Sequence, residues 1–231
     1  FGISLACGVV VALNTFATAA ELDKLIRAAD IQALLFENRV AKHDFEAGLC
    51  ELEPGIRSAA PGRLVSERFP FLRLLVSLED TEEHAILPWR EFLRSGAEIP
   101  DRLIEARAAN LAPSDTAILF FSSGSTGLPK GVLHNQRAVV LQWRQWPVAM
   151  GFSGSLRAWT ANGFFWSGNF AMVIGSALST GGTLVLQFTF DAEQAVRLMV
   201  EEKVNAPFAM LHQWGRIAEV PGFNDLDLSH M

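Results

Sequence analysis

The chain has 231 residues, half of them hydrophobic and 19% charged, and its formal net charge at pH 7 is −6. This length suits one large domain or two small ones with a sizeable core, and no apolar stretch approaches the ~20 residues that cross a bilayer. Because the net charge is negative and no basic run occurs, the composition argues against nucleic-acid binding through a basic surface.

The N-terminal part of the chain predicts alternating strands and helices. The apolar run 9–13 is rich in β-branched residues, which is typical of a buried strand. Thr18 followed by Glu21 forms a capping-box pattern, so a helix is expected from there to about Ala29. Residues 33–36 predict the next strand. Strand, helix and strand in this order indicate a unit of a parallel sheet.

The middle of the chain is less regular. A helix is expected over 41–52, a strand over 71–76 and a short helix over 88–93, where Pro88 suits the first helical position. The surrounding residues are polar and mixed. The apolar run 117–121 then predicts another buried strand.

The C-terminal part returns to a regular alternation. Trp143 and Trp146 are three residues apart on an expected helix, which favours one packed face, with ligand contact as the alternative. Pro207 indicates an edge strand. The expected helices are 136–146, 170–178, 192–203 and 211–219, and the expected strands are 157–160, 183–186 and 206–209. The chain is therefore expected to be an α/β protein with layered sheets flanked by helices.

The two cysteines and five histidines carry little functional signal. Two cysteines in a chain of this length do not form a disulfide framework, so a reduced, cytoplasmic protein is expected. Cys7 lies in an apolar run and is expected to be an inert core residue. The histidines are scattered without metal-ligand spacing, so no resident metal site is predicted.

A loop of small polar residues follows the strand predicted over 117–121. Residues 123–130 contain three hydroxyls, two glycines and a lysine. Glycines allow backbone N–H groups to approach phosphate oxygens, and hydroxyls and a lysine add further donors. The pattern is not a Walker A motif, because Lys130 follows Pro129 rather than a glycine. A merely flexible Ser/Gly loop is the alternative, but the Pro-Lys-Gly-Val continuation argues against it.

The order Ser-Ser-Gly-Ser-Thr-Gly-Leu-Pro-Lys-Gly-Val over 122–132 resembles the signature of the adenylate-forming superfamily, which holds acyl- and aryl-CoA synthetases, luciferases and peptide-synthetase adenylation domains. The resemblance implies that ATP binds with Mg²⁺ and that CoA is a co-substrate. It assigns the β- and γ-phosphates of ATP to Ser123, Gly124, Ser125, Thr126, Gly127 and Lys130.

The resemblance covers nearly the whole chain but only the middle of the family's pattern. Residues 1–231 are therefore expected to be part of the large N-terminal, AMP-binding domain, truncated at both ends. The C-terminal lid domain and the catalytic lysine are expected outside this chain, so the fragment alone is expected to be inactive.

The segment 162–170 carries three consecutive aromatic residues beside two glycines, a composition that allows either an apolar pocket or ordinary core packing. The resemblance places Trp166 and Gly168 on a wall of the acyl pocket. His212 could approach the site or be an exposed residue at a helix start. His134 and Gln136 depart from the family's Ser/Thr-His pattern, and their roles stay open.

The resemblance implies ATP-dependent activation of a carboxylic acid to an acyl-adenylate, followed by transfer to CoA. The segment 162–176 contains no acidic residue, and a buried ammonium without a partner is costly, so a fatty or aryl acid is predicted rather than an α-amino acid. Three alternatives stay open: a non-catalytic nucleotide-binding module of the same fold, a peptide-synthetase-type adenylation domain, and an unrelated phosphate-binding domain such as a kinase.

Overall fold

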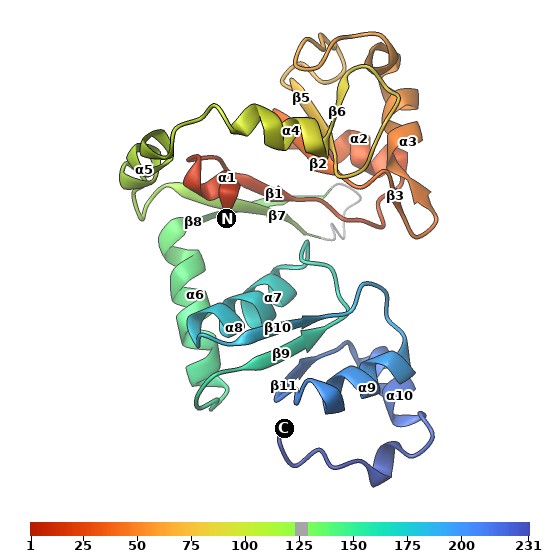
Figure 1. Ribbon diagram of the computed structural model, residues 1–231, viewed down its shortest axis with the longest axis vertical. Coiled ribbons are helices and arrows are strands. Elements are labelled where there is room, and N and C mark those ends of the chain that lie inside the picture. Colours follow the sequence, from red (N-terminus) through yellow and green to blue (C-terminus); the bar gives the residue numbers. More distant parts are fainter. Residues whose placement is uncertain (123–128) are drawn as a thin grey trace. The chain divides into compact units, whose positions relative to one another are not determined.

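The computed structural model describes residues 1–122 and 129–231, and the chain divides into two compact units. Unit 1 comprises Phe1–Ala112 and Ile118–Leu133, and unit 2 comprises Pro113–Ala117 and His134–Met231. Figure 1 labels most of the helices and strands of both units.

Two three-stranded sheets organise unit 1. In one sheet, β2, β5 and β6 are parallel neighbours, with Leu34 opposite Leu75 and Leu75 opposite Ile86. In the other, β1 pairs in parallel with β7, and β8 lies next to β7 (Figure 1). The strands are β1 (Val10–Ala12), β2 (Ala33–Phe36), β3 (Arg39–Val40), β4 (His43–Asp44), β5 (Leu74–Ser77), β6 (Ile86–Pro88), β7 (Thr116–Phe121) and β8 (Gly131–Asn135).

The helix predicted from the Thr18–Glu21 pattern is confirmed as α2. The Glu21 N–H donates to Thr18 Oγ1 at 3.3 Å, and the Thr18 N–H donates to the Glu21 carboxylate at 2.8 Å. Leu22 and Ile26 of α2 are buried against the sheet of β2 and β5, and burial of each such side chain contributes about 1.5–3 kcal/mol. The helices of unit 1 are α1 (Gly2–Leu5), α2 (Ala19–Ala28), α3 (Phe45–Leu52), the 3₁₀ turn η1 (Pro54–Arg57), α4 (Trp89–Gly96) and α5 (Asp101–Ala109).

The expected strand–helix–strand unit in a single sheet is wrong. β1 and β2, which flank α2, belong to different sheets, because β1 pairs with β7 and β2 pairs with β5. The local apolar pattern identifies both strands but contains no information about which distant run each one pairs with.

Two further expectations for unit 1 change, and one helix was not predicted. Cys7 is exposed rather than in the core, because the chain turns there with φ 59° and its thiol donates to the Arg107 carbonyl at 3.1 Å. The helix expected from residue 41 begins at Phe45, since β3 and β4 pair first and Asp44 caps the helix by accepting from the Ala47 N–H. Helix α5 was not predicted, because it has no buried residue and therefore no apolar periodicity in its sequence.

Unit 2 is a parallel sheet with helices on both faces, as Figure 1 shows. The central strand β9 carries Ala158, which faces the α7–α8 segment, and Trp159, which faces α9 and α10. β11 with Pro207 is the last strand in the described order β10-β9-β11. The strands are β9 (Arg157–Thr160), β10 (Thr183–Leu186) and β11 (Ala206–Phe208). The helices are α6 (Gln136–Ala149), α7 (Ser167–Asn169), the π-helix η2 (Phe170–Gly175), α8 (Ser176–Ser179), α9 (Ala192–Glu201), α10 (Leu211–Ala218) and the 3₁₀ turn η3 (Phe223–Asp225).

Helix α6 packs against η2 and α8. Its Trp143 is part of this packed face, as the spacing of Trp143 and Trp146 predicted. The Trp143 and Phe170 ring centroids are 5.3 Å apart. A Cβ built on Gly175 would lie 2.0 Å from Trp143 Cδ1, so only glycine allows this approach. The expected α/β fold with sheets flanked by helices is confirmed.

Candidate functional site

Two hydrogen bonds join Ser122 and Lys130, the residues at the two ends of the predicted phosphate motif. The Ser122 N–H donates to the Lys130 carbonyl at 2.9 Å, and the Lys130 N–H donates to Ser122 Oγ at 3.4 Å. The Lys130 side chain is exposed beside the start of β8. The other predicted phosphate ligands, Ser123, Gly124, Ser125, Thr126 and Gly127, lie outside the described residues. Their role therefore stays a prediction.

Gly131 explains part of the motif by close packing. A Cβ at this position would lie 3.2 Å from Leu119 Cδ1 of the neighbouring strand β7. A larger residue would displace the Leu119 side chain, so the glycine after Lys130 helps β8 to lie directly beside β7.

The predicted acyl segment begins where β9 ends. The Asn162 N–H donates to Thr160 Oγ1 at 3.1 Å, which starts a turn. A Cβ on Gly163 would lie 2.2 Å from the Phe165 ring, so a larger residue here would displace this ring. Trp166 is the N-cap residue of α7, is 45% exposed, and has its ring centroid 5.2 Å from that of Phe165. The segment therefore presents a large aromatic surface at the carboxyl end of a buried strand.

The other two predicted substrate residues are in open surroundings. A Cβ on Gly168 would meet no atom within 4 Å, so space is left at this position. His212 is the second residue of α10 and is exposed. Contact of Gly168 or His212 with an acid stays a prediction.

Two functional candidates escaped sequence analysis, the buried amides Asn169 and Gln213. Asn169 is 1% exposed, and its Nδ2 donates to the Asn162 carbonyl at 2.6 Å. Gln213 is 4% exposed, and its Oε1 accepts from Asn162 Nδ2 at 3.1 Å and from the Met210 N–H at 2.7 Å. These bonds join the acyl segment to the start of α10. In the sequence each amide is followed by an aromatic residue, Phe170 or Trp214, which is too common a pattern to identify either of them.

The positions that depart from the family's pattern have partly structural roles. Gln136 begins α6, and its N–H donates to the Asp115 carbonyl at 2.9 Å. The preceding Asn135 caps the same helix by accepting from the Ala138 N–H at 2.8 Å.

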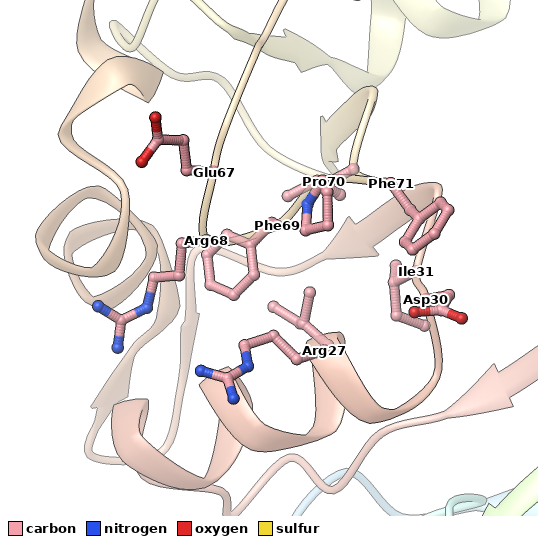
Figure 2. A pocket seen from close by; sticks show the side chains of 10 residues that line it. Arg27, Asp30, Ile31, Glu67, Arg68, Phe69, Pro70 and Phe71 are labelled. Carbon is pink, nitrogen blue, oxygen red and sulfur yellow. The ribbon is translucent and has the colours of Figure 1, made fainter.

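A cavity of about 340 Å³ in unit 1 is lined by none of these residues (Figure 2). Its walls combine the apolar side chains of Ile31, Phe69 and Phe71 with charged ones. Arg68 and Arg27, both on the wall, lie 2.7 and 3.9 Å from Asp23. The Arg68 hydrogen bond is the main reason that the pKa of Asp23 is lowered. Because the wall also carries carboxylates, the cavity has no surplus of positive charge for a substrate carboxylate.

Among residues 1–122 and 129–231, no group of three or more His, Cys, Asp or Glu side chains is arranged to hold a metal ion. Over the same residues, every helix is too short or too polar to span a bilayer.

The sequence motif over 122–132, followed along the chain by an aromatic segment on an α/β scaffold, is typical of adenylate-forming enzymes. The chain belongs to the family described as AMP-binding enzyme, whose model matches residues 1–231.

Two curated relatives match almost the whole chain. YngI of Bacillus subtilis (strain 168) is 26% identical over 96% of this chain and 40% of the relative. The 3-[(3aS,4S,7aS)-7a-methyl-1,5-dioxo-octahydro-1H-inden-4-yl]propanoyl:CoA ligase of Mycobacterium tuberculosis is 29% identical over 96% of this chain and 40% of the relative. The chain thus spans about 40% of the length of these curated relatives.

Solved structures show the same fold. The N-terminal domain of FACL13 from Mycobacterium tuberculosis, crystallised with an inhibitor, aligns with a TM-score of 0.67 at 19% identity, covering 99% of this chain and 50% of that chain. The fold of the described residues is therefore that of part of the N-terminal domain of adenylate-forming enzymes.

Proposed function

We propose that the chain supplies the phosphate-binding and acyl-binding parts of an ATP-dependent acid–thiol ligase. In this proposal residues 1–231 are part of a larger AMP-binding domain, and a C-terminal lid domain with the catalytic lysine lies outside them. The observation that carries the proposal is the family match over the whole chain, which includes the Ser122–Lys130 motif.

The proposed reaction has two steps. A carboxylate oxygen of the acid attacks the α-phosphorus of ATP, the bond to the β-phosphate bridging oxygen breaks, and pyrophosphate leaves. The CoA thiol then attacks the acyl carbon, and AMP leaves. Lys130 would stabilise charge on the polyphosphate, and Mg²⁺ bound with the nucleotide would neutralise it further. The chain's part in both steps is to position the reactants.

We propose an apolar acyl or aryl acid as the substrate. The aromatic surface at Trp166 suits an apolar group, and the segment 162–176 offers no carboxylate to pair with an ammonium. Both cysteines are free, which fits a reducing compartment such as the cytoplasm. A role in fatty acid metabolism follows if the preferred acid is a fatty acid.

The proposal is tested by ATP–pyrophosphate exchange with the intact protein across a panel of carboxylic acids. Lys130→Ala is expected to lower exchange about 100-fold, the size of effect seen when one charge-stabilising donor is removed. Lys24→Ala is the matched control, because Lys24 is an exposed lysine on α2 and is not part of the motif.

The products discriminate between the alternatives. Equal exchange by wild type and Lys130→Ala would remove the phosphate assignment. ATP binding without exchange for any acid would favour a non-catalytic module. Release of ADP instead of pyrophosphate would indicate a kinase.

A further inference from the structure

Four polar side chains fix the turn at Asn162 and Gly163. Thr160 Oγ1 accepts from the Asn162 N–H at 3.1 Å. Asn169 Nδ2 donates to the Asn162 carbonyl at 2.6 Å and the Gly163 carbonyl at 3.4 Å. Asn162 Nδ2 in turn donates to Gln213 Oε1 at 3.1 Å. Both backbone and side chain of the turn are therefore held. The name "amide cluster" is used below for Thr160, Asn162, Asn169 and Gln213.

The amide cluster lies where ligands of parallel sheets bind. Thr160 is the last residue of β9 and is opposite Phe208, the last residue of β11. Ligands of open α/β sheets bind beyond the carboxyl ends of the strands. Gln213 Oε1 also accepts from the Met210 N–H at 2.7 Å, so one oxygen joins the segment after β9 to the segment after β11.

Packing alone does not account for Asn169. It is 1% exposed, and in the described part of the chain its Oδ1 is buried without a hydrogen-bond partner. A buried acceptor without a donor destabilises the folded state, and an apolar side chain of similar size would avoid this penalty. What Asn169 contributes is the hydrogen bond from its Nδ2, which fixes the turn three residues before Trp166.

We propose that Gln213 and Asn169 are positioning residues that set the spacing between Trp166 and α10, and thereby select the width of the acid that the enzyme activates. The proposal rests on the function proposed above. Gln213 sets this spacing by binding Asn162 and the first turn of α10 with one oxygen, and Asn169 by fixing the backbone that leads to Trp166.

The test is a double-mutant cycle in the intact enzyme. Gln213→Met keeps the side-chain length but removes the shared acceptor, and Asn162→Ala removes its donor. The measured quantity is the ratio of kcat/KM for a slim acid, such as a straight-chain acid, to that for a broad aryl acid. Each single variant is expected to change this ratio at least about fivefold, with an unchanged KM for ATP. The double variant is expected to change it no more than Gln213→Met alone, because both remove the same bond.

Gln187→Met is the matched control. Gln187 is 5% exposed, and its Nε2 donates to the Asp191 carbonyl at 2.8 Å and to Gln194 Oε1 at 3.0 Å, so the same substitution also removes two partly buried hydrogen bonds. It is expected to lower stability without changing the acid ratio.

The two proposals fail in different ways. A wild-type enzyme that activates no acid overturns the proposed function and with it this inference. An active wild type whose acid ratio is unchanged in Gln213→Met, or changes equally in Gln187→Met, overturns only the inference. Additive effects of the two single variants also contradict it.

Discussion

The segment around Lys130 is held by exposed hydrogen bonds between Ser122 and Lys130, whereas the segment around Trp166 is held by buried amides. Phosphate recognition relies on accessible donors, which a short connection between two strands can supply. Recognition of an apolar group relies on the position of an apolar surface, and buried residues packed beneath that surface hold it in position. The comparison predicts that replacing an exposed group of these segments changes ligand binding with little loss of folding stability, whereas replacing a buried group also destabilises the fold.

The sharpest test of this comparison uses two tryptophans on either side of the same turn. Trp159 is 0% exposed in the core of unit 2, and Trp166 is 45% exposed. Trp159→Ala is expected to lower the free energy of unfolding by about 3–5 kcal/mol, because it leaves a large cavity. Trp166→Ala is expected to lower it by less than about 1 kcal/mol while raising the KM for the acid. Urea unfolding and exchange kinetics measure both quantities.

Equal losses of stability in the two tryptophan variants would contradict the comparison, since Trp166 would then be a packing residue. Stability loss confined to Trp159→Ala, with no change in acid use by Trp166→Ala, would support the packing difference but remove Trp166 from the acyl wall.

Sequence analysis predicted those features that depend on neighbours along the chain. The Thr18–Glu21 capping box and the strand over 157–160 are examples, because a cap needs two residues three apart and a buried strand needs one short apolar run. The pairing of β1 with β7 and the bond from Asn162 to Gln213 were not predictable, because each joins residues far apart in sequence. The expectation that Cys7 lies in the core was wrong for the same reason, since its thiol bonds to the distant Arg107 carbonyl.

The two cysteines extend the comparison to unit 1. Burial raises the pKa of the Cys50 thiol to about 11, with the Glu83 charge adding to the effect, whereas Cys7 is exposed. The thiolate is the reactive form, so iodoacetamide at pH 8 is expected to modify Cys7 and leave Cys50 unmodified in the folded protein. Peptide mass spectrometry measures both, and urea is expected to make Cys50 reactive. Modification of Cys50 without denaturant would show that this part of unit 1 opens locally.

The smallest effect is expected at the ion pair between Asp23 and Arg68. The hydrogen bond from Arg68 and the nearby positive charges lower the pKa of Asp23 in the folded state below its unfolded value of about 3.9. The pair therefore stabilises the fold fully above that unfolded pKa, and the contribution is lost as the pH falls through the lower, folded pKa. Because Arg68 is partly exposed, Arg68→Ala is expected to lower the urea midpoint only slightly at pH 7, and the difference from wild type should shrink below about pH 4.

Arg27→Ala, which removes the weaker contact at 3.9 Å, should have a smaller effect. A difference that persists unchanged at pH 3 would assign the effect of Arg68 to its packing over the Phe69 ring, 6.0 Å from the guanidinium carbon, rather than to charge.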